Sequence, residues 1–222
     1  KEDVFPECDQ FNGIHEGLVQ SWKDIFPKKG EIHFAGALEN NEDTGTLQYL
    51  ASTAMEAGFS TRVLDMQALD LQNGRFFDPA GELVNRCFKL YPWEWMVDES
   101  PDGCLAEMEW LEPIWKLVMS NKAILATLYE LFPDSPYVLP CYLSRPRSGL
   151  FCKKPVFSRE GHNVSVVDIR DWEEYVRIAE TEGDYNTGAY VYQEYVEPTA
   201  YSGRYPVIGS WIIGGEAAGI GI

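Results

Sequence analysis

Residues 150–169, LFCKKPVFSREGHNVSVVDI, predict two β-strands joined by a short polar loop. Lys154 stands before Pro155, and proline is typical of a strand edge or end, where the chain opens toward a cleft. The loop at 158–163 is small and contains a glycine, so its backbone N–H groups could hold phosphate oxygens and close over a ligand. Taken alone, an ordinary hairpin is the better explanation of this loop.

Two further features flank this segment. Residues 120–131 predict a capped helix, and Lys122 near its start could reach a phosphate, because a helix N-terminus favours anions. Residues 189–196 predict a strand that leaves its sheet before Pro198. Free backbone groups at such a strand end can pair with the edge of a base such as adenine, with Tyr195 as an apolar wall. A plain tyrosine-rich strand is the alternative.

The first hundred residues alternate helical and strand-like periodicity: helix 9–26, strand 32–38, helix 40–57 and strand 61–66. This order predicts a small α/β layer with a parallel sheet. The rest of the chain predicts a β-meander at 69–90, a helical turn at 92–96, strands at 137–143, 164–169 and 205–214, a helix at 171–180 and a two-glycine hairpin turn before 216–222.

Composition limits the classes of function. The 222 residues are 45% hydrophobic, which predicts a folded core, and the net charge of −17 argues against a nucleic-acid partner. The acidity suits a cationic substrate such as a polyamine, although plain solubility explains it better. Five scattered cysteines favour reduced thiols in a cytoplasmic protein, and Cys152 is expected to be buried and inert. No apolar run is long enough to span a bilayer.

Several long segments agree, in order and spacing, with one known family. LEPIWKLVMSNKAILATLYELFPDSPYVLP, KKPVFSREGHNVSVV, YVYQEYVEP and YPVIGSWIIGGEAAGIGI resemble the glutathionylspermidine synthase family of acid–amine ligases. Upstream, DQFNGIHEGLVQSWK, IHFAG followed by EDTGT, and CFKLYPWEWM resemble the preceding region of the same family. The resemblance covers nearly the whole chain.

The resemblance implies an α+β, ATP-grasp-type fold, with a small α/β pre-ATP-grasp and substrate region at 1–104 and a nucleotide-binding region at 105–222. It implies that Lys122 and Lys154 bind the phosphates of ATP. The loop residues Arg159, Glu160 and Gly161 would cover the phosphates, and the strand end formed by Gln193, Glu194, Tyr195 and Val196 would contact adenine. No side chain of the chain is expected to act as a nucleophile or as a metal ligand.

The implied reaction uses ATP and Mg²⁺ to convert a small-molecule acid into an acyl phosphate, which an amine then attacks. The family places its magnesium-binding segments before the point where this chain begins, and an Arg-Glu-Asp segment after Ile222. Both ends are therefore expected to be cut from a longer protein, and the chain alone is expected to lack ligase activity. Leu90 and Trp95 stand where the glutathione-using members carry threonines, so the acid is expected to differ from glutathione.

Two alternatives stay open beside the ligase: a catalytically inactive nucleotide-binding or interaction module, and a structural domain without a nucleotide. The histidines His15 and His33 are expected to be structural, whereas His162 in the loop could touch phosphate. Glu42 suits a helix N-terminus better than a substrate site, and Glu94 has an exposed surface role as its simplest explanation. The acid, the amine and the oligomeric state do not follow from the sequence.

Overall fold

The computed structural model describes residues 12–171, 174–185 and 188–221. The chain divides into two compact units. The first contains Lys1–Ile114 together with Ala200–Ile222, and the second contains Trp115–Thr199. Their elements give the mixed α/β and α+β class that the sequence predicts.

The first unit is built on a parallel sheet in the order β2-β1-β6-β7. Its strands are β1 (Glu31–Gly36), β2 (Ser60–Asp65), β6 (Arg86–Leu90) and β7 (Glu109–Leu111). Helix α2 (Asn41–Glu56) connects β1 to β2, and the side chain of Asn40 caps it by accepting from the N–H of Glu42. The predicted strand–helix–strand layer is therefore confirmed.

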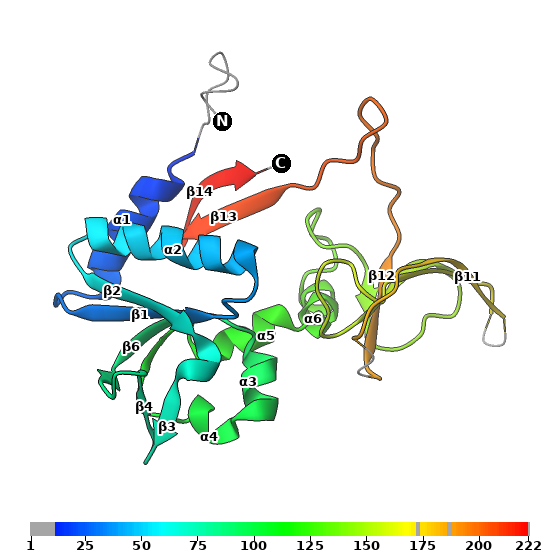
Figure 1. Cartoon of the computed structure of the whole chain (residues 1–222). Helices are drawn as coiled ribbons and strands as arrows, with labels where there is room; N and C mark the ends of the chain where they lie inside the picture. Colours follow the sequence, from blue (N-terminus) through cyan, green and yellow to red (C-terminus); the bar gives the residue numbers. More distant parts are fainter. Residues whose placement is uncertain (1–11, 172–173, 186–187, 222) are drawn as a thin grey trace. The chain divides into compact units, whose positions relative to one another are not determined.

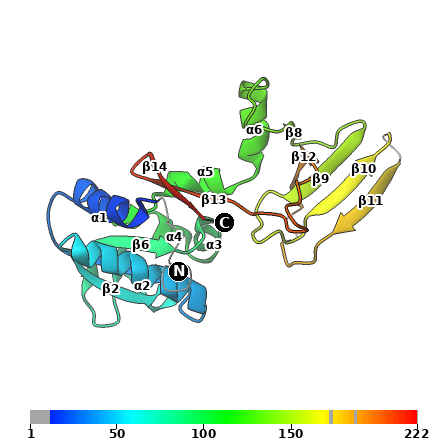
Figure 2. The same cartoon turned by 90° about the horizontal axis from the view of Figure 1, so that it is seen from above.

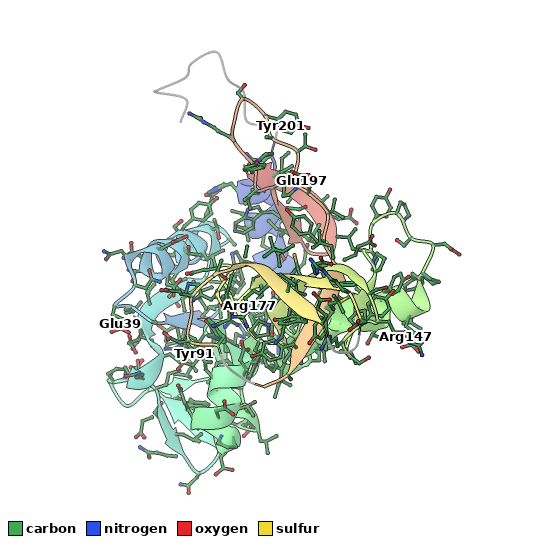
Figure 3. All side chains as sticks on the ribbon, turned by 90° about the vertical axis from the view of Figure 1, so that its right-hand side faces the viewer. Glu39, Tyr91, Arg147, Arg177, Glu197 and Tyr201 are labelled. Carbon is green, nitrogen blue, oxygen red and sulfur yellow. The ribbon has the colours of Figure 1, made fainter. Side chains whose placement is uncertain are left out.

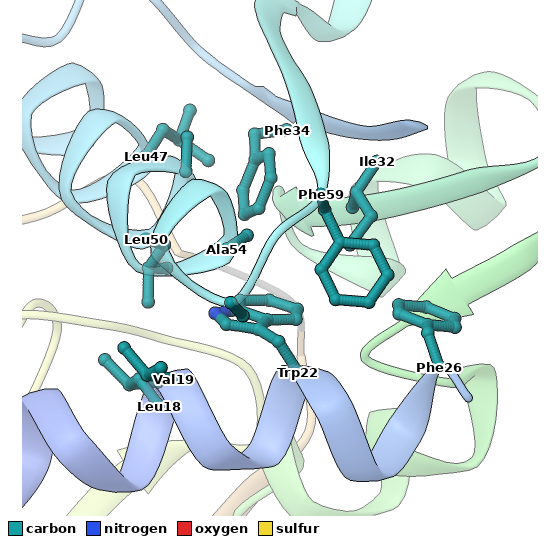
Figure 4. Packing of buried hydrophobic residues seen from close by; sticks show 12 residues of the cluster. Leu18, Val19, Trp22, Phe26, Ile32, Phe34, Leu47, Leu50, Ala54 and Phe59 are labelled. Atoms are coloured by element: carbon teal, nitrogen blue, oxygen red, sulfur yellow. The ribbon is translucent and has the colours of Figure 1, made fainter. Parts of the chain in front are cut away.

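Helices α1 (Ile14–Ile25) and α2 cover one face of this sheet (Figure 1). Ile32 and Phe34 point to that face because they alternate along β1, and both are fully buried. Trp22 of α1 meets the Phe34 ring edge-on at 5.5 Å and donates from Nε1 to Oγ1 of Thr53. Figure 4 shows this cluster, in which each fully buried large side chain contributes about 1.5–3 kcal/mol.

A small antiparallel sheet, β3-β4-β5, lies on the other face with the helices α3 (Trp93–Glu99) and α4 (Pro101–Cys104) (Figure 1). Its strands are β3 (Asp70–Gln72), β4 (Arg75–Phe77) and β5 (Leu83–Val84). Asn73 and Gly74 both have positive φ, 50° and 76°, as a tight hairpin turn requires. The predicted meander is confirmed for these strands, whereas β6 leaves it and joins the parallel sheet.

The hairpin formed by β13 (Gly209–Ile213) and β14 (Glu216–Gly221) belongs to the first unit. The N–H of Gly13 donates to the carbonyl of Ala218 at 2.7 Å, which ties the hairpin to the start of α1. Gly214 and Gly215 make the turn with positive φ, as the sequence predicts. Contacts in space thus join the two ends of the chain, while the predicted functional division after Cys104 stays a prediction.

The second unit is a five-stranded antiparallel sheet in the order β11-β10-β9-β12-β8 (Figure 2). The strands are β8 (Cys141–Tyr142), β9 (Gly149–Pro155), β10 (Ser165–Ile169), β11 (Tyr175–Glu180) and β12 (Tyr190–Glu194). Three short helical turns also occur in the chain: η1 (Met66–Ala68), η2 (Ile114–Lys116) and α5 (Leu117–Ser120). Helix α6 (Ala123–Leu131) packs beside the sheet, with Ala126 against Cys141 and Val191.

The helix predicted at 171–180 is wrong. Residues 175–180 form β11, which pairs with β10 from Tyr175 opposite Ile169 to Glu180 opposite Ser165. The glutamates and aliphatic residues of this segment fit the periodicity of a helix as well as that of a strand. The free edge of β10 offers backbone hydrogen-bond partners, and pairing with this edge favours the strand. Of the predicted helix, residues 172–173 lie outside the described residues, as does the first part of the helix predicted at 9–26.

Candidate functional site

Lys154 lies near the end of β9, directly opposite Val191 of β12. Side chains that stand opposite each other share a face of the sheet, so Lys154, Val191 and the next alternate residue, Gln193, point to the same side. The Lys154 Nζ donates to Oε1 of Gln193 at 2.6 Å. Two residues that the sequence assigns to different parts of one site are therefore in direct contact.

Lys122 comes just before α6 and contacts the loop that follows β9. Its backbone N–H donates to the carbonyl of Val156 at 2.8 Å, and its Nζ donates to Oγ of Ser158 at 3.0 Å and to the carbonyl of the same serine. These bonds fix the lysine to the first residue of the polar loop. Lys154 lies two residues before Val156, so one lysine belongs to the stretch 154–158 and the other, Lys122, is hydrogen-bonded to it.

The loop at 158–163 makes a turn whose base is tied to a second segment. Glu160 and Gly161 have positive φ, 53° and 72°, a conformation that can point successive N–H groups toward an anion. The side chain of Asn163 donates to the carbonyl of Gly183 at 2.8 Å and accepts from the N–H of Tyr185 at 2.7 Å. The base of the loop is therefore held, while its tip carries the residues expected to cover a phosphate.

Two backbone N–H groups at the end of β12 make hydrogen bonds to neighbouring segments. The N–H of Glu194 donates to the carbonyl of Pro140 at 2.8 Å, and the N–H of Tyr195 donates to the carbonyl of Leu150 at 3.0 Å. Val196 lies beyond β12 and is 56% exposed. Figure 3 labels Glu197 on the segment that follows.

A hollow of about 530 Å³ opens next to this arrangement, within the second unit. Asn121 and Ala123, which flank Lys122, line one part of it, and Tyr190 and Tyr192 of β12 line another. Its lining does not include Lys122 or Lys154. Tyr190 and Tyr192 point to the sheet face opposite to Lys154, so the hollow does not enclose this lysine.

The face of β9 that carries Lys154 also carries Cys152, opposite Gln193. Burial raises the pKa of the Cys152 thiol, and the nearby Lys154 only partly offsets this. The side chain is half-buried and not fully buried as predicted. The thiol stays protonated near neutral pH, as expected for an inert cysteine.

Within the described ranges, no group of three or more His, Cys, Asp or Glu side chains is placed to hold a metal ion. No step through a metal ion is assigned to these residues. In the same part of the chain no helix combines the length and apolar character that crossing a membrane requires.

The sequence profile of the family described as glutathionylspermidine synthase preATP-grasp matches residues 1–222. The chain belongs to this glutathionylspermidine synthase family. A provisionally named acid–amine ligase of Haemophilus influenzae is 34% identical, over 96% of the chain and 58% of its own length. A trypanothione synthetase of Crithidia fasciculata is 27% identical, over 87% of the chain and 33% of its own length.

A bifunctional glutathionylspermidine synthetase/amidase of Escherichia coli is also 27% identical, over 94% of the chain and 38% of its own length. The chain thus spans between about a third and three fifths of the curated relatives it matches. These relatives are named as ligases or synthetases, so the family is one of ligases. The recognition made from the sequence segments is confirmed.

Two segments that resemble the family, IHFAG and CFKLYPWEWM, run along β1 and β6. These are the two central strands of the sheet, from which the chain continues outward in opposite directions to β2 and β7. Figure 3 labels Glu39 and Tyr91, which follow these two strands. Leu90 ends β6, and Trp95 is 40% exposed and meets the Tyr91 ring edge-on at 5.5 Å. The carboxyl ends of two neighbouring parallel strands at such a point are a common ligand position.

Other singled-out residues take part in structural contacts. His15 lies 3.2 Å from the Tyr49 hydroxyl and 3.0 Å from a Glu56 carboxylate oxygen, which links α1 to α2. Glu42 lies in the first turn of α2, and Glu94 lies in the first turn of α3. His162 stands beside the Tyr185 ring, with 6.0 Å between the ring centres.

Sequence reasoning missed Lys89, which is 6% exposed at the end of β6. Its Nζ lies 3.8 Å from the Trp93 ring centre and donates to the carbonyl of Tyr91. Burial lowers the pKa of Lys89 to about 8. The sequence carries little signal for this, because the burial of Cys87 and Lys89 on one face of β6 is seen only in the structure.

Proposed function

We propose that the chain supplies the ATP-binding half of a ligase that joins a carboxylic acid to an amine. Family membership and the names of the relatives support the ligase class. The observation that carries the nucleotide site is the joint placement of two lysines around one loop. Lys122 is bonded to Ser158, and Lys154, four residues earlier on β9, is bonded to Gln193.

In this proposal the phosphates of ATP lie against the two lysines and under the tip of the loop at 158–163. Transfer of the γ-phosphoryl group to the acid forms an acyl phosphate and ADP. The amine then attacks the acyl carbon, an amide bond forms and phosphate leaves. Catalysis of the first step depends on positioning and charge neutralisation, which fixed ammonium groups supply. Gln193 holds the Lys154 ammonium near its working position before the phosphates arrive.

Adenine would lie against the strand end at 193–196. The N–H groups of Glu194 and Tyr195 are used within the sheet, which leaves the Glu194 carbonyl and the N–H of Val196 as the pair to meet a base. Both groups face the β8 side, since alternate residues of a strand direct their backbone groups to the same neighbour.

The substrates are proposed as classes. The amine is a cation that suits an acidic protein, with a net charge of −17, and a polyamine is one example. The acid would meet Leu90 and Trp95, whose side chains offer no hydroxyl donors. This favours an acid other than glutathione. Mg²⁺ is the expected cofactor beside ATP, and a cytoplasmic location stays a prediction.

Calorimetric titration with ATP and Mg²⁺ tests the nucleotide site, with Lys153 as an internal control. Lys153 lies on the opposite face of β9, 4.0 Å from the Tyr190 ring centre. Lys154→Ala should weaken ATP binding at least tenfold, and Lys153→Ala should leave it within twofold, because a charge-assisted bond to phosphate is worth about 1.5–3 kcal/mol. Equal affinities for both variants and the unchanged protein would overturn the site.

Turnover separates the ligase from its alternative. Phosphate release that depends on both an acid and an amine supports the ligase. ATP binding without any such release, in a protein that contains the flanking segments of the relatives, would favour an inactive nucleotide-binding module.

A further inference from the structure

Successive residues of β12 form backbone hydrogen bonds alternately with its two neighbouring strands, β9 and β8. Tyr195 donates to Leu150, so this residue faces β9, and Glu194 donates to Pro140, so this one faces β8. The register agrees, since Tyr192 stands opposite Tyr142 and Gln193 opposite Cys141, which puts Glu194 opposite Pro140. In an antiparallel ladder such a pair normally exchanges two N–H···O bonds.

Pro140 can make only one of these two hydrogen bonds. Its carbonyl accepts from Glu194 at 2.8 Å, but a proline has no N–H to donate to the Glu194 carbonyl. The chain before it also turns away, because the N–H of Val138 approaches the carbonyl of Ser135 at 3.4 Å. The ladder between β8 and β12 therefore ends at the pair Pro140–Glu194, with one hydrogen bond instead of two.

We propose that Pro140 is a positioning residue that keeps the Glu194 carbonyl available to the nucleotide base and thereby favours adenine over guanine. This inference rests on the proposed function. An acceptor at Glu194 and a donor at Val196 match adenine, which presents its amino group as a donor and N1 as an acceptor. Guanine presents the reverse pair along the same edge, an O6 acceptor and an N1–H donor, and a reversed pair leaves both sides unsatisfied.

Hydrogen exchange on the Pro140→Ala variant tests the backbone claim without any nucleotide. The new N–H of residue 140 should bond to the Glu194 carbonyl and exchange at least tenfold more slowly than an open amide. Pro136→Ala is the matched control, because Pro136 is exposed in the preceding turn and its new N–H should exchange freely. Free exchange at residue 140 in a folded Pro140→Ala variant would overturn the inference whatever the protein binds.

Titration with ATP and GTP tests the selectivity. Pro140→Ala should bind ATP about five- to tenfold more weakly and lose a similar factor of its preference over GTP, the cost of one contested hydrogen bond. Pro136→Ala should keep both affinities. If the unchanged protein binds ATP and Pro140→Ala keeps its affinity and preference, the role of Pro140 fails while the proposed function stands. If the unchanged protein binds neither nucleotide, the proposed function fails, and the selectivity claim fails with it.

Discussion

The two units of the chain use their sheets in different ways. The parallel sheet of the first unit has helices on one face and a small sheet on the other, and its central residues Ile32 and Phe34 are fully buried. The antiparallel sheet of the second unit buries smaller clusters, such as Phe151 with Val167, and carries two adjacent lysines on β9. The first unit is organised around packing, whereas the second presents charged side chains and open backbone groups.

Substitutions in the two units should therefore have different main effects. A change in the hydrophobic core of the first unit should mainly alter the free energy of unfolding. A change on β9, on the loop or at the strand end should mainly alter ligand binding. Four substitutions test this division, from the largest expected effect to the smallest.

Trp22→Ala should have the largest effect. The side chain is 4% exposed, donates to Thr53 and meets the Phe34 ring edge-on, so its removal leaves a large cavity. We expect a loss of about 3–5 kcal/mol in the free energy of unfolding, measured by urea denaturation. Trp115→Ala, at a position that is 60% exposed, should change it by less than about 0.5 kcal/mol. Equal losses would contradict the central role of the first core.

Val191→Ala tests the smaller core of the second unit. Val191 is fully buried on β12 and packs with Ala126 and Cys141. Removing two methyl groups should cost about 1–2 kcal/mol, less than the tryptophan change, by the same denaturation measurement. A loss as large as that of Trp22→Ala would show that the second unit depends on packing as strongly as the first.

Asn163→Ala tests the tether of the loop. The substitution removes the bonds to Gly183 and Tyr185, so the loop should open more easily, by about 1 kcal/mol. Hydrogen exchange should become about fivefold faster at 158–163 and stay unchanged in α2. Unchanged exchange in the loop would mean that other contacts hold its base.

His33 should give the smallest effect, visible only in acid. The ring is 2% exposed and lies 3.7 Å from a Glu31 oxygen and 3.9 Å from an Asp78 oxygen. Burial lowers its pKa below the ordinary 6.5, so the folded state binds this proton less readily than the unfolded state. Stability is therefore fully present above pH 6.5 and falls as the pH drops toward the lowered value.

A pH series of denaturation curves measures the contribution of His33. His33→Gln should flatten the fall in stability below pH 6.5. If the free energy of unfolding falls with pH equally steeply in His33→Gln and in the unchanged protein, His33 does not contribute to the pH dependence of stability.

Local patterns were enough for much of the fold. Asn40 predicted the start of α2 because a short polar side chain can cap a helix, and Gly58, with φ of 94°, ends the same segment. The strand at 175–180 was missed because its pairing depends on the free edge of β10, which is not a local property. The packing of the hairpin at 209–221 against α1 is equally non-local.

The candidate site was predictable in its parts and less so in its contacts. Lys122 and Lys154 were selected from the resemblance, and their partners Ser158 and Gln193 emerged only from the structure. Pro140 gave no signal in the sequence, because its effect depends on the register that sets it opposite Glu194. A proline that acts through its missing N–H can be recognised only when the pairing of its strand, here β8 with β12, is known.

Hydrogen exchange with and without ATP and Mg²⁺ tests the central claim most directly, because it observes both units at once. We predict that ATP slows exchange at 158–163 and 193–196 and leaves the core of α1 and β1 unchanged. Slower exchange confined to the first unit, or no change in those two segments at saturating ATP, would contradict the assignment of the nucleotide to the second unit.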